Sequence, residues 1–590
     1  MKYDVLVKIL DQIRNEASSA YRKKYASDCP NTDENLEKIN QARSRAYIHL
    51  FLKVSFGIES FDDREHYITD GSYDGGIDGY YINKDNKCIY LLQSKFRTTS
   101  TNFEEKEIAY DELLAMDVDR ILSGESTDDN GNEYAGKIKQ LQREISELSD
   151  IARYTYKIII IANTKTEYNK LKRLCSGYPI EVFNSEKCYS QLVFPVIKGT
   201  YYNESDLTIN IDLSNKNAGS KISYSVSTAS GPCDITVLFV PTLEIAKMMD
   251  KYRNSILKYN PRSYLTHDGS SIHNAIRDTL INKNTNEFAI FNNGITMLSD
   301  ETQINEQIGQ KNKAKLLITN PQIINGGQTC FTLSRIYQEY KNSNYENIFQ
   351  EKEVLLKIIT LHENTESDSK QSEEKKLELI ESISNATNRQ TPVINADKNS
   401  NEKIHIDLQK LLFDKYGILY ERKRGEFEDG LHNNYINESQ IIERNYLLRI
   451  YMAVSGNLEK VKTKKLFQNY KLPSSILTDE EILSKINIGL SVLSKILKPK
   501  KYQKLTLKDY LTVFMYTNYI YNNNLDVINY STYLSAMEIE NSSFRGYIKS
   551  HREIKSKNIK IDRKTNTPTE RIKYFPIDYQ KLYKDYISSK

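Results

Sequence analysis

The stretch from Asp70 to Arg97 contains residue types that together could hold a metal ion and a phosphate group. Acidic and glycine residues come first, and two apolar runs follow with a polar, turn-forming string between them. Two β-type runs about a short Asp-Asn turn predict a β-hairpin. The turn is expected between Asp85 and Asn86. With that centre, antiparallel pairing places Asp78 directly opposite Gln93.

The chemistry expected of this hairpin is metal-assisted hydrolysis of a phosphodiester. Side chains alternate along a strand, so Gln93 and Lys95 lie on the same face of the hairpin. Asp78, opposite Gln93, lies on that face as well. We expect the Asp78 carboxylate and the Gln93 amide oxygen to bind Mg²⁺ or Mn²⁺. Lys95 would orient the attacking water or stabilise charge growing on the phosphate. Glutamine is a weak ligand for a hard cation, and the candidates for a further acid are Asp74, which we assign to the metal, Asp70 and Glu37.

The same residues also have a plainer interpretation. Acids in a glycine-rich turn and polar residues at a strand end are common without any ligand. The compound spacing and the cross-strand register favour the metal site over this alternative.

Two short segments of the hairpin carry a family resemblance. Asp74-Gly75-Gly76-Ile77-Asp78-Gly79 with Gln93-Ser94-Lys95 resembles the Mrr-type branch of the restriction-endonuclease-like nucleases. That branch has Gln-x-Lys where most of the superfamily has Glu-x-Lys. The resemblance implies a mixed sheet flanked by helices, metal ligands on two strands and Mg²⁺-dependent cleavage, usually of DNA.

The elements around the hairpin predict an α/β domain over residues 1–200, which we interpret as restriction-endonuclease-like. The apolar, β-branched run 156–161 is typical of a buried central strand. The other expected elements are helices within 1–57 and at 103–122, 133–152 and 167–175, and a strand at 180–183.

Three further regions follow in the chain. Residues 201–232 are rich in Asn, Ser and Gly and are interpreted as a connector, 233–430 as a second, mixed α/β domain, and 431–590 as a basic, mostly helical region. The expected strands are 235–240, which Pro241 stops, 288–297, 316–318 and 354–360. The expected helices are 243–259, 329–340, 373–386, 401–416, 441–454, 479–497 and 507–522.

A second resemblance extends over several ordered blocks of the second and third regions. The blocks are Asn260-Pro261-Arg262, Asn274-Ala275-Ile276, Phe291-Asn292-Asn293-Gly294-Ile295-Thr296, the segment 320–329, Ala386-Thr387-Asn388-Arg389-Gln390 and Tyr420-Glu421-Arg422-Lys423-Arg424-Gly425. Together they resemble the AIPR family, the abortive-infection phage-resistance proteins of bacteria. The resemblance implies an antiphage role and no particular reaction.

One of these blocks is a candidate phosphate site. Asn325, Gly326, Gly327 and Gln328 lie between an expected strand and an expected helix, and free backbone amides at a helix start bind anions. The block faintly resembles DGQHR-type domains, which are associated with nucleic acid. Equally, the Asn and Gln side chains could tie loops together by hydrogen bonds to the backbone. Asn292-Asn293-Gly294 has the same two interpretations, with a turn favoured.

Two basic segments have a similar ambiguity. Arg422, Lys423 and Arg424 could grip phosphates or pair with neighbouring glutamates, although a short charged run is usually a solvated face. The last forty residues hold eleven Lys or Arg against five Asp or Glu. Their aromatic residues could stack on nucleic acid or simply pack between helices. These aromatic residues are Tyr574, Phe575, Tyr579, Tyr583 and Tyr586.

Composition narrows the class of protein. A chain of 590 residues with 39% hydrophobic and 27% charged residues is typical of several globular domains. The six cysteines lack metal-ligand spacing and predict reduced, buried thiols. We expect a cytoplasmic protein without a membrane partner, because the N-terminal helix is charged and the longest apolar run, 158–162, is short. No Walker loop is present, which disfavours ATP-driven remodelling.

Taken together, the sequence predicts an antiphage effector. A Mg²⁺-dependent endonuclease would be regulated by the AIPR region and act on nucleic acid, DNA rather than RNA, after a phage-derived trigger. A homodimer or higher homo-oligomer is compatible with two-strand cleavage. The alternative is a non-catalytic sensor that binds nucleic acid or a nucleotide, and Gln93 is the residue that favours it.

Overall fold

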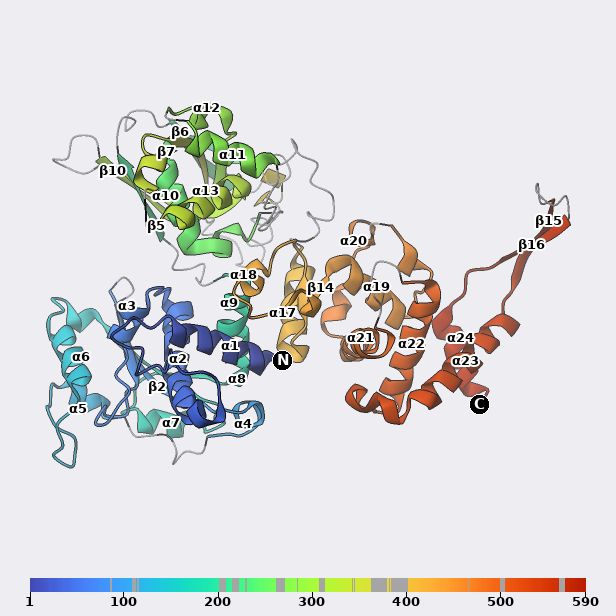
Figure 1. Ribbon diagram of the computed structural model, residues 1–590, viewed down its shortest axis with the longest axis horizontal. Helices are drawn as coiled ribbons and strands as arrows, with labels where there is room; N and C mark the ends of the chain where they lie inside the picture. The colour runs from blue at the N-terminus through green and yellow to red at the C-terminus, as the bar shows by residue number, and fades with distance from the viewer. Residues whose placement is uncertain are drawn as a thin grey trace. The chain divides into compact units, whose positions relative to one another are not determined.

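The structure is a computed structural model of the chain (Figure 1). It describes residues 1–84, 87–108, 113, 116–200, 208–214, 222–228, 231–260, 271–283, 285–306, 313–341, 343, 345–361, 379–380, 382–383, 400, 402–464, 466–498, 505–561 and 568–590. The chain divides into two compact units. The first comprises Met1–Thr387 and Arg424–Glu438, and the second comprises Asn388–Lys423 and Ser439–Lys590.

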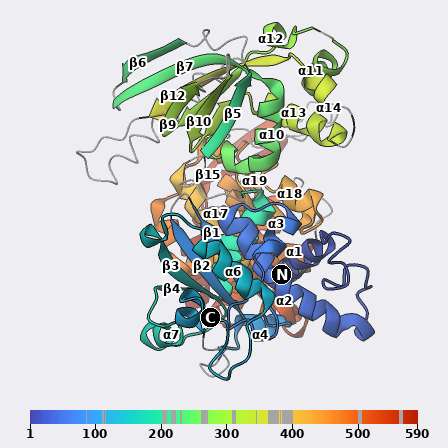
Figure 2. The same cartoon turned by 90° about the vertical axis from the view of Figure 1, so that its left-hand side faces the viewer.

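A four-stranded mixed sheet lies in the N-terminal part of the first unit (Figure 2). Its strands, in spatial order, are β1 Gly79–Asn83, β2 Cys88–Ser94, β3 Thr155–Ile161 and β4 Ile180–Phe183. The first pair is antiparallel and the other two pairs are parallel. Gly79 lies opposite Leu92, which confirms the predicted hairpin register. The turn residues Asp85 and Asn86 lie outside the described residues.

Helices cover both faces of this sheet. On one face Tyr80, Leu91 and Ile160 share a core with Ile138 of α6 (Gly136–Ser146). On the other face Ile48 of α2 approaches Gly79 so closely that a side chain there would contact it. The remaining helices here are α1 Lys2–Asn15, η1 Asp33–Asn35, α2 Leu36–Phe56, α3 Phe61–His66, α7 Tyr168–Leu174, α8 Ser185–Lys187, η4 Cys188–Val193 and α9 Phe194–Lys198.

The prediction of one continuous helix over residues 103–122 is wrong. Its ends form two short helices, α4 Ser100–Glu104 and α5 Val118–Leu122. Between them the Ile108 N–H donates to the Asn163 carbonyl at 2.8 Å, and the Asp117 N–H donates to the Gly75 carbonyl at 2.9 Å. At these two described positions, hydrogen bonds to distant segments take the place of hydrogen bonds within a helix. The expected helix 133–152 is present but shorter, as α6 and η3 Ile151–Arg153.

Two further sheets make up the rest of the first unit. A three-stranded sheet has the order β5-β10-β9, and a five-stranded sheet has the order β11-β8-β12-β7-β6. The strands are β5 Thr208–Ser214, β6 Ile222–Thr228, β7 Gly231–Pro241, β8 Ile295–Ser299, β9 Glu301–Glu306, β10 Lys313–Thr319, β11 Gln322–Asn325 and β12 Glu353–Leu361. The segment 201–232 therefore supplies β5 and β6 to these sheets.

The helices of this part depart from expectation at two points. The helix expected at 243–259 ends at Tyr252, because Arg253 has a positive φ of 47°. The strand expected at 288–297 begins only at Ile295 and is preceded by a helical turn. The elements are α10 Thr242–Tyr252, η6 Arg253–Leu257, α11 Ser271–Ile281, α12 Phe288–Phe291, α13 Gly327–Tyr340, α14 Tyr345–Phe349 and α18 Glu428–His432. The helix expected at 373–386 lies almost entirely outside the described residues.

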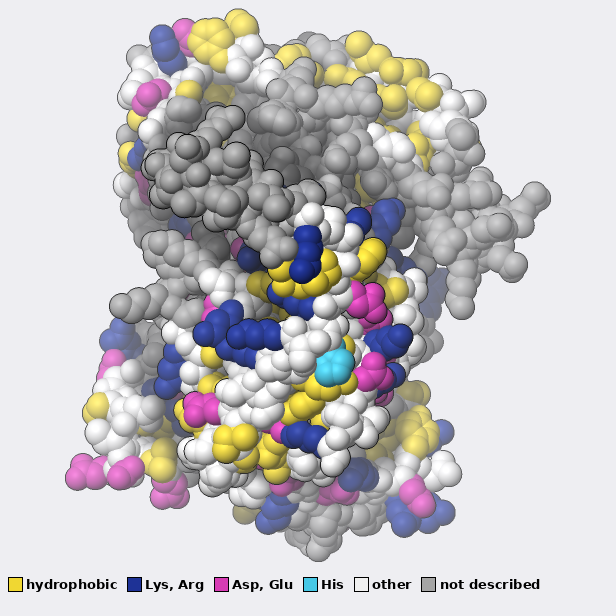
Figure 3. All heavy atoms as spheres, turned by 90° about the vertical axis from the view of Figure 1, so that its right-hand side faces the viewer, with side chains coloured by type: hydrophobic (Ala, Val, Ile, Leu, Met, Phe, Trp, Pro, Cys, Tyr) yellow, Lys and Arg dark blue, Asp and Glu magenta, His cyan; other side chains and the backbone are white. Residues whose placement is uncertain are grey.

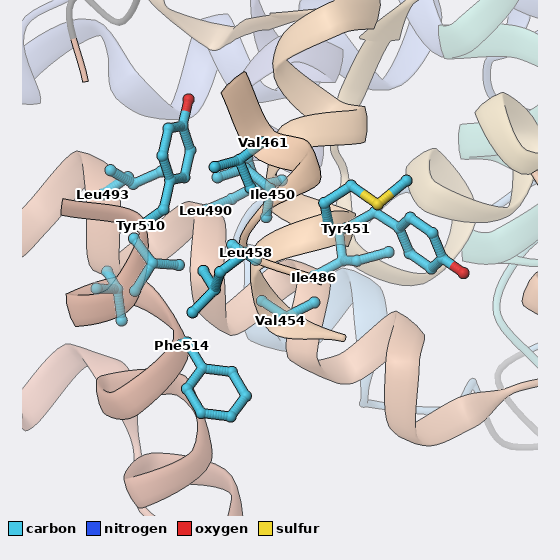
Figure 4. Packing of buried hydrophobic residues seen from close by; sticks show 14 of the residues in the cluster. Ile450, Tyr451, Val454, Leu458, Val461, Ile486, Leu490, Leu493, Tyr510 and Phe514 are labelled. Atoms are coloured by element: carbon cyan, nitrogen blue, oxygen red, sulfur yellow. The ribbon is translucent and has the colours of Figure 1, made fainter. Parts of the chain in front are cut away.

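The second unit is mostly helical, as predicted. Ile450 and Val454 of α19, Ile486 and Leu490 of α21 and Phe514 of α22 point into one core (Figure 4). Its longer helices are α17 Lys403–Tyr416, α19 Arg444–Val454, α21 Glu480–Ser491, α22 Leu507–Asn522, α23 Leu534–Ser550 and α24 Tyr579–Ser588. Its shorter helices are η8 Lys460–Lys462, α20 Leu466–Asn469, η9 Ser474–Leu477, η10 Val492–Leu497 and η12 Val527–Thr532.

Four short strands complete the second unit. The parallel pair is β13 Leu419–Glu421 with β14 Ile441–Glu443, and the antiparallel pair is β15 Ile554–Ile561 with β16 Pro568–Tyr574. The helix expected from residue 441 therefore begins three residues later. All six cysteines are free, and five of them are buried, as predicted. None of the described helices combines the length and apolarity needed to cross a bilayer.

Candidate metal centre

Three aspartates meet at the entrance to β1. Asp70, Asp74 and Asp78 each offer a carboxylate oxygen, and these oxygens lie within 4.8 Å of one another. Asp74 and Asp78 are buried, with 8% and 7% of their surface exposed, whereas Asp70 is half-buried. The structure thus groups Asp78 with two of the three predicted upstream acids. The third, Glu37, is exposed at the start of α2 and lies outside this cluster.

Local backbone bonds hold the two buried carboxylates in place. Asp74 accepts from the N–H groups of Gly71 at 3.1 Å and Gly76 at 2.9 Å, which folds the loop around its side chain. The Asp78 carboxylate accepts from the N–H of Ser94 at 2.6 Å. The Asp78 N–H also donates to the Leu92 carbonyl at 2.8 Å, which continues the hairpin pairing toward Gln93.

The electrostatics of the cluster show an excess of buried negative charge. The pKa of Asp78 is raised to about 7, mainly by burial and in addition by the nearby carboxylates of Asp74 and Asp70. Burial likewise raises the pKa of Asp74, with a contribution from Asp70. The backbone bonds and the ammonium group of Lys95 act in the opposite direction on both pKa values, but they do not cancel the increase.

Gln93 and Lys95 lie at the same end of the sheet. Gln93 is 2% exposed, and its Nε2 donates to the Gly76 carbonyl at 3.0 Å, which fixes the orientation of the amide beside the acidic loop. Lys95 follows directly after β2 and is half-buried, and its N–H donates to the Ile161 carbonyl at 3.0 Å. The structure therefore brings the predicted acid, amide and lysine together.

Arg45 is a member of this site that sequence reasoning missed. It extends from α2, and its Nε lies 2.8 Å from the Asp70 carboxylate. A single arginine within a charged helix carries no spacing signal that links it to a loop more than twenty residues later. Its presence means that one of the three acids is already paired with a cation, while the two buried ones are not.

The donor set fits a hard divalent cation. Carboxylate and amide oxygens are the ligands that Mg²⁺ and Mn²⁺ prefer. Asp74 and Asp78 would hold the ion, with Asp70 or the Gln93 amide oxygen completing the protein ligands. The raised pKa of Asp78 is the physical sign of fit, because a buried carboxylate among like charges is stabilised by a cation.

The predicted phosphate loop has a different character. Gly326 precedes α13 with a φ of +86°, and a Cβ there would lie 2.9 Å from the Gly294 carbonyl oxygen. The Asn325 side chain accepts from the Gly326 N–H at 2.7 Å. Asn292 accepts from the Gly294 N–H at 3.0 Å and donates to Thr329 Oγ1 at 3.1 Å. These bonds favour the interpretation in which the side chains tie two loops together. Gly327 and Gln328 are half-buried in the first turn of α13.

The first two residues of the basic segment after β13, Arg422 and Lys423, are not exposed to solvent. Arg422 is 5% exposed and Lys423 is 2% exposed. Arg422 donates to the Ser400 carbonyl at 2.7 Å and to Gln409 Oε1 at 3.2 Å. Arg424 is exposed. Because Arg422 and Lys423 are buried, Arg424 is the residue of these three that could contact a phosphate without a rearrangement.

Most of the aromatic residues near the C-terminus pack internally. Three of them are buried in the core of the second unit, whereas Tyr574 and Phe575 are 40% and 48% exposed. The packing interpretation therefore holds for the helical part of the tail. The buried residues are Tyr579, Tyr583 and Tyr586.

Comparison with known proteins gives one finding. The family model described as "AIPR protein" matches residues 257–564, which is more than half of the 590 residues. The match begins after the four-stranded sheet and the aspartate cluster, and it extends through most of the second unit. Neither the curated proteins nor the solved structures gave a match. The chain belongs to the AIPR family.

Proposed function

We propose that the protein is an antiphage effector whose N-terminal part is a Mg²⁺- or Mn²⁺-dependent endonuclease. Membership of the AIPR family suggests a role in abortive infection. The observation that supports the nuclease is the cluster of Asp70, Asp74 and Asp78 beside Gln93 and Lys95. Abortive infection requires a toxic activity held in check, and the family region is where we place that control.

The chemistry proposed is hydrolysis of a phosphodiester. A divalent cation bound here would polarise the phosphoryl oxygen and acidify a water molecule. The carboxylates of Asp74 and Asp78 hold and neutralise that charge, and Gln93 contributes a neutral oxygen. Lys95 aligns the attacking water or stabilises the charge on the phosphate as the P–O bond breaks. The proton of the water leaves with solvent, and the departing oxygen takes up another.

Arg45 fits this proposal as a charge balance for the acidic cluster. Its guanidinium pairs with Asp70, the most exposed of the three acids. This ion pair reduces the negative charge that a polyanionic substrate meets. The two buried carboxylates, Asp74 and Asp78, stay available to bind the cation.

A second candidate function is a non-catalytic sensor of nucleic acid or nucleotide. The observation that favours it is Gln93, because an amide donates to Gly76 where an acid would add a charged ligand. The variant Gln93→Glu separates the two. A metal-dependent nuclease keeps or gains cleavage when its neutral ligand becomes an acid, whereas a binding module stays inert.

The direct test uses purified full-length protein with Mg²⁺ and with duplex DNA, single-stranded DNA or RNA, in the presence and absence of phage lysate. Cleavage by the wild type that Asp78→Ala and Lys95→Ala abolish supports the nuclease. Asp28→Ala is a matched control, because Asp28 is 72% exposed and only pairs with Arg22. Equal cleavage by all four proteins, or none under any condition, rejects the catalytic assignment.

A further inference from the structure

One short segment of the second unit carries a larger net positive charge than the chain as a whole. Residues 554–574, which comprise β15, β16 and the residues that connect them in the sequence, contain seven Lys or Arg residues and two Asp or Glu residues, a net charge of +5. The whole chain carries +4, so all remaining residues together carry −1. This hairpin is therefore a local source of attraction for a polyanion.

The hairpin is a two-stranded ribbon that projects beyond α23 and α24 (Figure 1). Its strands pair with each other along their length, from Ser556 opposite Lys573 to Ile561 opposite Pro568, and no third described strand joins them. Lys555, Lys557 and Lys573 are exposed. An isolated two-stranded ribbon is only marginally stable in water, so binding to a partner would add to its stability.

Aromatic contacts anchor the base of the ribbon to the helices. The guanidinium of Arg552 lies 5.0 Å from the ring centre of Tyr574, and the ammonium of Lys555 lies 5.7 Å from that of Phe575. Tyr579, a few residues later, is buried in the helical core. Figure 3 shows this side of the molecule, where exposed Lys and Arg side chains lie among hydrophobic, acidic and uncharged groups.

The dimensions and charge of the ribbon fit one kind of nucleic acid. Eight residues of strand extend over about 27 Å, and the major groove of B-form DNA, about 12 Å wide, admits a two-stranded β-ribbon. The major groove of duplex RNA is deep and narrow, and side chains cannot read it. Groove geometry therefore favours duplex DNA over duplex RNA as the partner.

We propose that the β15–β16 hairpin is an arm that enters the major groove of duplex DNA and supplies most of the protein's affinity for it. The acidic cluster near β1 repels phosphate when no cation is bound, so the attraction must come from elsewhere in the chain. The inference extends the proposed nuclease by naming its substrate class. DNA binding by the arm itself requires no cleavage.

The test measures binding without catalysis. Every protein carries Asp78→Ala, and fluorescence anisotropy with a 20-base-pair DNA is recorded in EDTA as a function of salt. The arm variant replaces three exposed ribbon lysines by glutamine: Lys555→Gln, Lys557→Gln and Lys573→Gln. The matched control removes the same charge from exposed positions on α23 and α24: Lys549→Gln, Lys581→Gln and Lys584→Gln.

The expected result is a clear separation of the two triple variants. The arm variant should raise Kd by roughly tenfold or more and reduce the salt dependence of log K by up to about 2.7, from three lost phosphate contacts. The control should change Kd by less than about threefold, because its lysines lie outside the groove. Duplex RNA of equal length should bind weakly and respond alike to both variants.

Two outcomes overturn the proposal. One is equal DNA binding by the arm and control variants. The other is RNA binding that equals DNA binding and depends equally on the arm, which would indicate general attraction to polyanions. If the nuclease assay shows no cleavage but the arm variant still binds DNA more weakly than the control variant, only the catalytic assignment is rejected. When the two sets of lysine substitutions are made in protein that keeps Asp78, full cleavage of duplex DNA by both, together with no difference in binding, rejects the arm alone.

Discussion

The loop before β1 and the loop before α13 are both rich in glycine and polar residues, yet they differ in how their polar groups are satisfied. In the first loop two buried carboxylates lie among like charges, and burial raises the pKa of Asp78 to about 7. In the second loop Asn325 bonds to the Gly326 N–H, and in the adjoining loop before β8 Asn292 bonds to the Gly294 N–H. An uncompensated buried charge indicates a site that awaits a ligand, whereas satisfied amides indicate a structural role.

The largest effect that tests this contrast comes from replacing the central acid. Asp78→Asn should reduce cleavage by roughly 10²–10³-fold, since the change removes a charge next to the reacting phosphate. In the absence of metal the same change should leave the melting temperature equal or higher, because it removes a destabilised carboxylate. A cleavage assay and a thermal melt in EDTA measure the two effects. A large drop in melting temperature would assign Asp78 a structural role instead.

The second prediction concerns stability and pH. The folded pKa of Asp78 lies above the ordinary value of 3.8, so the folded state binds more protons than the unfolded state between these values. The contribution of Asp78 to stability is therefore present at low pH and is lost as pH rises from about 4 through 7. Metal-free wild type should lose stability over this window relative to Asp78→Asn, as urea unfolding at several pH values would measure. Parallel pH profiles for the two proteins would contradict the raised pKa.

Metal binding should reverse that loss. Mg²⁺ at about 100 times its Kd should stabilise the wild type by about 2.7 kcal/mol at pH 8, and by less at pH 6, where a proton competes for Asp78. The double variant Asp74→Asn, Asp78→Asn should show no shift in melting temperature with Mg²⁺. An equal shift in the double variant would place the cation elsewhere.

In the second loop the expected effects are on folding alone. Gly326→Ala places a Cβ 2.9 Å from the Gly294 carbonyl oxygen and forces a φ of +86° on an L-residue, which should cost about 1–3 kcal/mol. Urea unfolding measures this cost. Cleavage per folded molecule and the affinity for inorganic phosphate should stay unchanged. A selective loss of phosphate affinity would restore the ligand-binding interpretation of this loop.

The smallest effect is expected from one side chain of the loop before β8, which bonds to Thr329 of α13. Asn292→Ala removes the bonds to the Gly294 N–H and to Thr329 Oγ1, for a loss of about 1 kcal/mol. Asn293→Ala is a neighbouring control, because Asn293 is exposed and adjacent in the chain. Equal stability of the two variants would show that the Asn292 bonds contribute little.

Local pattern was enough to predict several elements closely. The alternating hairpin, the β-branched strand β3 and the amphipathic helix α22 lie where their periodicity placed them. Periodicity failed where the chain bonds to distant segments, as between α4 and α5, where Ile108 and Asp117 use backbone groups of other loops. The positive φ of Arg253 ended a helix that the pattern continued.

The sequence by itself determined the hairpin register, the placement of Asp78 opposite Gln93, and the family to which the chain belongs, because these depend on local spacing and ordered motifs. Only the tertiary structure decided that Asp70 and Asp74 join Asp78, that Arg45 pairs with the cluster, and that Arg422 and Lys423 are buried. The physical reason is that burial and charge proximity arise from segments far apart in the chain. Their effect on a carboxylate, such as the raised pKa of Asp78, appears only when those segments meet.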